Sequence, residues 1–328
     1  MSVSAHPGGL PLIVRPRDPR LATDIDAFVD WFHAGKNHFD RLASVHGALL
    51  LRGFPLRETQ DFQRAMERYP LNNLGYTAGY VPRRQLAERV FESTQAPRQH
   101  ALRLHQEMSY LPSFPRMLSF FSRRSASVGG ETPLADCREL ERRLPRRLWE
   151  GVKARGVRYE RNYAAPGSQA DRTVYIGKSW TAAFGTEDPA QAEALCRSMG
   201  LEPVWRDDGS LSTLYSAPGF VQHPLTGETV WFNQIGPQNL HRRSLGEARW
   251  RALVADRPAG SYLHSNATYG DGEDIDEEDL DALFDAFEDL AVTIRWRDGD
   301  LMLIDNILTA HGRNPYEGER DVQVALLG

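Results

Sequence analysis

A histidine and a glutamate one residue apart, His105 and Glu107 in LRLHQEMSY (102–110), are the first candidates for chemistry in this sequence. If the segment is a β-strand, the two side chains leave the same face, about two residue rises apart. An imidazole and a carboxylate placed in this way can hold a divalent metal ion. A second histidine from a distant segment would complete the two-histidine, one-carboxylate arrangement that binds Fe(II) and leaves coordination positions open.

The third ligand is predicted to be His311, in MLIDNILTAHGRNPYEG (302–318). It follows an apolar run typical of a strand and precedes a turn, so its ring can point from a strand end into the mouth of a barrel. The H-x-E spacing alone is weak, because a chain with ten histidines produces it by chance. Among the other histidines, His223 precedes a proline in a predicted hairpin and is interpreted as structural. Arg320, at the start of the last predicted strand, could pair bidentately with a ligand carboxylate or with a neighbouring glutamate on the surface.

Several other chemistries lack their motifs. The sequence has no H-E-x-x-H, no G-x-S-x-G elbow, no GxGxxG and no Walker-type loop, which weighs against zinc proteases, serine hydrolases and nicotinamide enzymes. Two cysteines provide neither a disulfide framework nor a thiolate metal site. A net charge of −5 and a pI of about 6.1 argue against a general nucleic-acid or anionic-membrane binder.

The length and composition are those of an ordinary globular protein, with 328 residues of which 41% are hydrophobic. The N-terminal residues do not read as a signal peptide, and no apolar run approaches the length of a membrane span. The cysteine usage suits a reducing cytoplasm, which is the expected location.

The elements that must position the candidate residues are short. Many strand-like runs, a few helices and no βαβ alternation predict a mainly β protein with flanking helices and a jelly-roll-like double sheet. Residues 1–22 are interpreted as an irregular N-terminal arm, and residues 23–328 as a single domain. The acidic stretch 271–290 is predicted to be a solvated surface helix rather than a calcium loop. The predicted strands are 47–54, 90–94, 117–123, 129–137, a hairpin at 223–233, 292–296, 300–306 and 321–327, and the other helices are 24–43, 58–69, 138–150 and 187–199.

Several long motifs carry a family resemblance. The segments VFESTQAPRQHALRLHQEMSYLPSFPRMLSFF and GGETPLADCREL resemble the TauD/TfdA group of Fe(II)/2-oxoglutarate dioxygenases. The similarity continues through TAAFGTEDPAQAEALC, HPLTGETVWFNQ and AHGRNPYEGERDVQVAL, and covers about residues 45–328 in order. Within the group, the sequence is most similar to the SyrP-like branch, which is associated with amino acid hydroxylation in natural-product pathways.

The resemblance implies a double-stranded β-helix core with His105, Glu107 and His311 on iron. It also implies that Thr132 and Arg320 bind the far carboxylate of 2-oxoglutarate, with Arg313 as a second candidate. Many relatives have Asp where this chain has Glu107, but the SyrP-like and clavaminate-synthase-like enzymes have Glu. The family's HNEMSY reads HQEMSY here, so Gln106 replaces Asn.

The resemblance therefore predicts hydroxylation of an unactivated C–H bond in an amino acid, free or bound to a carrier protein, with O2 as the oxidant. A carboxylate at 107 favours this outcome over halogenation, for which related enzymes have a small residue. Desaturation or cyclisation at the same iron site remains open, as does a non-catalytic jelly roll that binds a metal or small molecule. The substrate candidates are Arg103, Tyr76, Tyr110, Trp231 and Asn233, although Trp231 is as consistent with a packed core aromatic.

Overall fold

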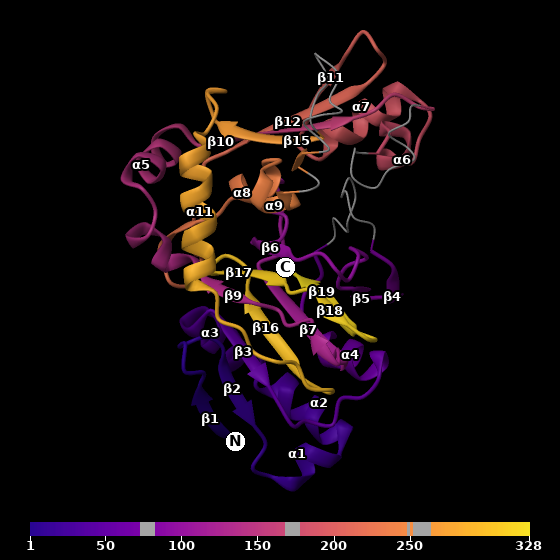
Figure 1. The fold of residues 1–328 in the computed structure, drawn as a ribbon. Helices are drawn as coiled ribbons and strands as arrows, with labels where there is room; N and C mark the ends of the chain where they lie inside the picture. The colour runs from indigo at the N-terminus through magenta and orange to yellow at the C-terminus, as the bar shows by residue number, and fades with distance from the viewer. Residues whose placement is uncertain (73–82, 168–177, 248–249, 252–263) are drawn as a thin grey trace.

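The computed structural model describes residues 1–72, 83–167, 178–247, 250–251 and 264–328 (Figure 1). These residues form a mainly β protein with short helices around several sheets. Figure 1 shows a large sheet of N-terminal and C-terminal strands at one end, a sheet of central strands at the other end, and the strands β6 and β17 between them. No helix in the described part of the chain combines the length and apolarity needed to cross a bilayer.

The largest sheet has eight strands in the described residues. Its neighbours are antiparallel except for β2 and β3, which are parallel. In sheet order the strands are β1 (Ser2–Ala5), β2 (Leu12–Arg15), β3 (Ala48–Leu51), β16 (Leu301–Asp305), β7 (Met117–Arg124), β19 (Asp321–Leu327), β5 (Val90–Glu92) and β4 (Gln85–Ala87).

The central strands of this sheet are apolar along their whole length because both of their faces are covered. Leu303 of β16 packs in one buried cluster with Phe28 and Phe62 from the N-terminal helices, whereas its neighbour Met302 packs into a second cluster on the opposite face. This double burial explains the continuous hydrophobic runs in the sequence. The N-terminal helices are α1 (Pro19–Thr23), α2 (Ile25–Ala34), α3 (Lys36–His46) and α4 (Thr59–Met66).

A second sheet of three strands lies next to the first and carries the two candidate histidine ligands. Its order is β6 (Leu102–His105), β17 (Thr309–Arg313) and β9 (Leu134–Asp136), all antiparallel. The chain passes from the first sheet to the second through the short turn between β16 and β17. Strands from the two sheets therefore meet at this turn.

The central strands and several helices form an upper layer in Figure 1. A four-stranded antiparallel sheet has the order β11 (Glu202–Trp205), β12 (Leu211–Ala217), β10 (Val157–Tyr163) and β15 (Ser265–Tyr269). The other elements are β8 (Val128–Gly129) with β18 (Tyr316–Glu317), β13 (Phe220–Gln222) with β14 (Thr229–Trp231), the 3-10 helix η1 (Cys137–Arg142), and the helices α5 (Arg146–Arg155), α6 (Trp180–Phe184), α7 (Pro189–Ser198), α8 (Ile235–Gln238), α9 (Arg242–Leu245) and α11 (Glu277–Leu290).

The N-terminal residues differ most from the sequence-based expectation. Residues 1–22 were expected to form an irregular arm, but they contain β1, β2 and the start of α1. The run LIVR (12–15) is largely buried and pairs with β3, so it is an integral strand of the largest sheet. Flanking prolines and glycines hid this strand, because the run itself has only four residues.

Two predicted helices and one predicted strand are also placed differently. The helix expected at 24–43 is divided into α2 and α3 at Gly35, and the helix expected at 138–150 is divided into η1 and α5. The segment 292–296 forms only an isolated bridge, between Val292 and Leu134, instead of a strand.

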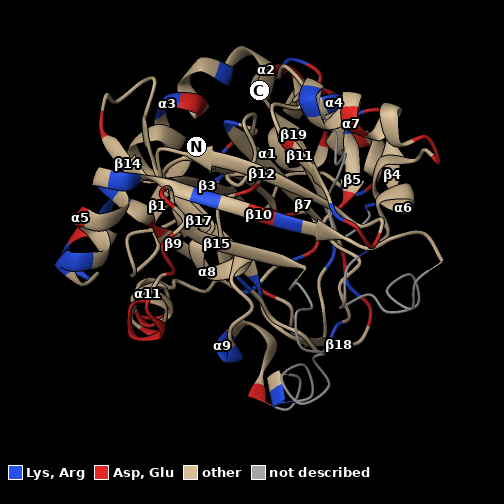
Figure 2. Cartoon of the chain, turned by 90° about the horizontal axis from the view of Figure 1, so that it is seen from above, with Lys and Arg blue, Asp and Glu red and all other residues tan. Residues whose placement is uncertain are grey.

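The acidic segment forms helix α11, as predicted, and its apolar side chains are buried. Its carboxylates are not simply solvated, because many of them pair with arginines of neighbouring segments. Figure 2 shows acidic residues (red) along α11 and basic residues (blue) on α5 and α9. The pairs are Arg242 with Glu277 and Asp281, Arg243 with Asp285 and Glu288, Arg147 with Glu278 and Asp279, and Arg143 with Asp289.

Candidate metal centre

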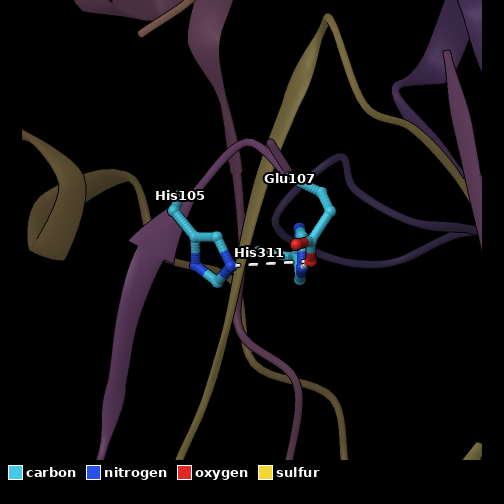
Figure 3. Close-up of side chains that lie close together, drawn as sticks. All are labelled: His105, Glu107 and His311. Carbon is cyan, nitrogen blue, oxygen red and sulfur yellow. Dashed lines mark ion pairs between the residues drawn. The ribbon is translucent and has the colours of Figure 1, made fainter. Parts of the chain in front are cut away.

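Three side chains from two distant segments meet at the second sheet (Figure 3). The possible ligand atoms of His105, Glu107 and His311 all lie within 4.8 Å of one another. Glu107 Oε2 is 3.9 Å from His105 Nε2 and 3.7 Å from His311 Nε2. The two histidines face each other because β6 and β17 are antiparallel neighbours and the register pairs His105 with His311. Strand pairing thus brings together residues that are far apart in the sequence.

Glu107 reaches the cluster by a different route from the one predicted. Strand β6 ends at His105, and Glu107 lies in the turn that follows. The next residue, Met108, has φ 59°, and it is the only non-glycine residue with positive φ in the described chain. A left-handed residue turns the backbone sharply, and it is unfavourable for a side chain such as Met. The carboxylate therefore depends on a turn that other contacts must hold.

The protonation of the cluster suits a metal ion. Burial and the neighbouring His105 lower the pKa of His311 to about 4, so its imidazole is neutral at pH 7. Burial alone would raise the pKa of Glu107, but Arg83 and the two histidines outweigh it and hold that pKa well below its usual range. His105 Nδ1 lies 2.8 Å from the backbone carbonyl of Arg103, which it reaches as a donor. This hydrogen bond occupies Nδ1, so Nε2 is the ring nitrogen that faces Glu107.

The donor set therefore fits a divalent cation such as Fe(II). It offers imidazole nitrogens and one carboxylate oxygen, a combination of borderline and hard ligands. All three side chains are largely buried. Three protein ligands would leave coordination positions of such an ion open to small molecules.

A polar pocket beside the cluster contains both residues expected to bind a second carboxylate. Thr132 and Arg320 line it together with His105 and His311. Arg320 is half-buried, and desolvation together with the nearby Arg313 lowers its pKa to about 10, so it keeps its charge at pH 7. Its Nε donates to the carbonyl of Gly130 at 2.9 Å. A partly buried cation in the same pocket as a threonine hydroxyl is suited to a carboxylate.

Arg313 lines the same pocket but is committed to the backbone. Its guanidinium donates to the carbonyls of Ala96, Pro97 and His100 at distances of 2.6–2.8 Å. These bonds fix the loop that precedes β6. Arg320 is therefore the better placed of the two arginines for a cosubstrate.

The structure brings few of the substrate candidates to the cluster. The guanidinium of Arg103 pairs with Glu288 of α11 at 2.8 Å, and Arg103 lines a separate cavity that contains none of the three clustered residues. Trp231 is fully buried and stacks on Trp149, so it is a core aromatic. Asn233 is hydrogen-bonded to the backbone of Gly219 and Ile235. The Tyr110 ring lies 4.8 Å from the Arg161 guanidinium. Tyr76 lies outside the described residues.

His223 is structural, as interpreted from the sequence. It is fully buried, and its Nε2 lies 2.9 Å from Asp305 Oδ2. The same aspartate accepts hydrogen bonds from the backbone of Ile307 and Leu308. This histidine therefore supports the turn between β16 and β17.

Two further residues at the centre were not found by sequence reasoning. Arg83 lines the pocket, and its Nη2 lies 2.9 Å from Glu107 Oε2. Asn306 holds the backbone of Glu107 through two hydrogen bonds. No spacing rule identifies Arg83. Asn306 could have been found, because Asp305 and Asn306 are residue types that favour tight turns and they stand shortly before His311.

The whole chain is similar to one enzyme family. The sequence profile described as "Taurine catabolism dioxygenase TauD, TfdA family" matches residues 14–326. The dapdiamide synthesis protein DdaC of Enterobacter agglomerans is 31% identical over 306 residues, covering 93% of this chain and 89% of that protein. A clavaminate synthase-like protein of Arabidopsis thaliana is 27% identical, covering 96% of this chain and 93% of that protein.

Solved structures support the fold. The PvcB protein from Pseudomonas aeruginosa matches with a TM-score of 0.51 and 16% identity, over 96% of this chain and 85% of that one. AAD-2, solved in complex with Mn(II) and N-oxalylglycine, matches with a TM-score of 0.52 and 12% identity, over 100% of this chain and 97% of that one.

Proposed function

The chain belongs to the TauD/TfdA dioxygenase family, and on that premise we propose that it hydroxylates an unactivated C–H bond of an amino acid, free or bound to a carrier protein. As a member of this family, the protein is an enzyme that depends on Fe(II), 2-oxoglutarate and O2. Relatedness to a dapdiamide synthesis protein supports a role in natural-product biosynthesis. We also propose that the first two sheets form a double-stranded β-helix core of a single cytoplasmic domain.

One observation carries the assignment of the site, namely the convergence of two imidazoles and one carboxylate on a common point. In this proposal His105, Glu107 and His311 hold Fe(II) on one side. The bound metal and its cosubstrate supply the oxidising power that breaks the C–H bond. Thr132 and Arg320 would orient 2-oxoglutarate by binding its far carboxylate, and burial would keep bulk water from the reacting atoms.

The test is succinate formation by the purified protein. Succinate should appear only when Fe(II), 2-oxoglutarate and O2 are all present, and a screen of amino acids, free and loaded on carrier proteins, should raise its rate for the true substrate. The product should gain the mass of one oxygen atom. Absence of metal-dependent succinate formation across the screen, in protein shown to be folded, would contradict the proposal.

Desaturation or cyclisation at the same site is the second candidate. Both outcomes use the same iron and cosubstrate, but the product loses the mass of two hydrogens instead of gaining an oxygen. The family membership favours either outcome over a non-catalytic binding protein.

A further inference from the structure

Two turns lie against each other behind Glu107, and each uses a side-chain amide to hold the backbone of the other. Asn306, in the turn between β16 and β17, accepts through Oδ1 from the Glu107 N–H at 2.7 Å and donates through Nδ2 to the Glu107 carbonyl at 3.0 Å. In return, Gln106 Nε2 donates to the carbonyl of Ile307 at 2.7 Å. Both amides are fully buried. Gln106 and Asn306 together are called the amide clamp below.

The amide clamp is also anchored outside the two turns. Asn306 Nδ2 donates to the carbonyl of Pro115 at 2.7 Å, and Gln106 Nε2 donates to the carbonyl of Trp231 at 2.9 Å. The backbone carbonyl of Gln106 accepts from Gln234 Nε2 at 2.6 Å. These bonds connect the two turns to two further segments, around Pro115 and at 231–234, so the Glu107 turn is held as part of the protein interior.

Glu107 needs such support because it lies beyond the end of β6. Within a strand, neighbouring backbones would fix its N–H and C=O groups, and the side chain would be aimed by the pleat. The two bonds from Asn306 satisfy the same two backbone groups. The positive φ of Met108 adds an unfavourable conformation that the surrounding contacts must maintain.

We propose that Gln106 and Asn306 are positioning residues of the metal centre. The amide clamp sets where the Glu107 carboxylate stands relative to His311, because Asn306 belongs to the turn that leads directly into the strand of His311. Ligands held in place before the ion arrives bind it more tightly than ligands that must be ordered on binding. The inference rests on the proposed function, since it requires that Glu107 is a metal ligand.

The test is a titration of the metal-free, full-length protein with Mn(II), in which electron paramagnetic resonance measures the free ion. Asn306→Ala should raise the Kd for Mn(II) by about tenfold or more, the range for loss of a residue that orients a metal ligand. Gln106→Asn keeps an amide but shortens the side chain by one methylene group, so a smaller increase in Kd is expected. Melting temperatures of the same metal-free samples report the purely structural effect.

Asn239→Ala is the matched control. The Asn239 side chain is buried, and its Nδ2 also donates to two backbone carbonyls, those of Ile235 and Ala267, both at 3.0 Å. The substitution should lower the melting temperature as Asn306→Ala does, yet leave the Kd for Mn(II) within about twofold of the wild type.

The outcomes separate the inference from the proposed function. If Asn306→Ala and Asn239→Ala lower the melting temperature alike and neither changes the Kd, the amide clamp serves the fold alone and the inference is overturned. If Asn306→Ala does not fold, Gln106→Asn decides by the same comparison. A wild-type protein that binds no Mn(II) overturns the proposed metal centre itself, and the positioning role with it.

Discussion

Arg83 Nη2 lies 2.9 Å from Glu107 Oε2, the same carboxylate oxygen that faces the Nε2 atoms of both histidines. Both side chains of this pair are nearly buried, with exposed fractions of 12% and 7%. A carboxylate in this position has a cation on one side and the proposed metal position on the other. Arg83 therefore compensates the charge of Glu107 when no metal is bound.

Replacing Arg83 should destabilise the metal-free protein more than the metal-bound protein. In Arg83→Met the buried carboxylate loses its partner, a change that typically costs about 3–5 kcal/mol. A bound Mn(II) ion would supply positive charge in place of the guanidinium, so the loss should be smaller in its presence. Thermal unfolding with and without saturating Mn(II) measures both values.

The control for this prediction is Arg52→Met. Arg52 and Asp300 form another buried pair, at 2.6 Å, at the end of β16 opposite the turn that contains Asn306. Its loss should lower the melting temperature equally with and without Mn(II). An equal loss for Arg83→Met would contradict the prediction.

Substitution of any proposed ligand should remove the metal. His105→Ala, Glu107→Ala and His311→Ala should each abolish stoichiometric Fe(II) binding and succinate formation. His223→Gln is the control, because His223 is a buried histidine that is not a proposed metal ligand. This substitution should lower the free energy of unfolding by about 1–3 kcal/mol while Fe(II) binding is retained. The measurement is bound iron per chain, and full iron binding by His311→Ala would refute the assigned ligand set.

Arg320 and Arg313 should have separable effects. Arg320→Met removes a charged hydrogen-bond donor worth about 1.5–3 kcal/mol, so the KM for 2-oxoglutarate should rise by about 10-fold to 150-fold. Thr132→Val removes a neutral bond and should raise the KM by about tenfold at most. Arg313→Met should instead lower stability, because three backbone carbonyls lose their donor. Steady-state kinetics with varied 2-oxoglutarate would expose an error if Arg313→Met gave the larger change in KM.

The stability of the metal-free protein should fall as the solution is acidified. The pKa of His311 is about 4 in the folded protein and about 6.5 in an unfolded chain. Between these two values the unfolded chain binds a proton that the folded protein does not, so His311 should contribute a loss of up to about 1.4 kcal/mol per pH unit. Urea unfolding between about pH 5 and pH 7 measures the dependence. His311→Gln should flatten it, and an unchanged slope would show that another group is responsible.

The three side chains singled out from the sequence converge in the structure, although part of the local structure expected around them is different. His105 and Glu107 were expected on one face of a strand, but the strand ends at His105 and the carboxylate is delivered by a turn with a positive φ at Met108. Arg103, two residues before His105, was a substrate candidate, whereas its guanidinium pairs with Glu288 of α11. Strand periodicity predicts side-chain direction only while the strand continues, and one sequence does not reveal where pairing stops.

Long-range partners were the hardest part to predict. Arg83 has no motif around it, and its contact with Glu107 arises only from the tertiary fold. The strand at 12–15 was missed because four residues give too short a pattern against prolines and glycines. By contrast, β7, β16 and β19 were predicted close to their observed bounds, since strands buried on both faces are apolar at nearly every position.

The pairing of β2 with β3 has a practical consequence for N-terminal truncation of this protein. Strand β3 lies between β2 and β16, and β16 leads directly into the turn that holds Asn306. A shortened polypeptide that begins after Arg15 would leave the parallel edge of β3 unpaired, and such an edge invites pairing with another molecule. Insoluble material, rather than a soluble protein with weakened iron binding, should be the first sign that the N-terminal strands have been removed.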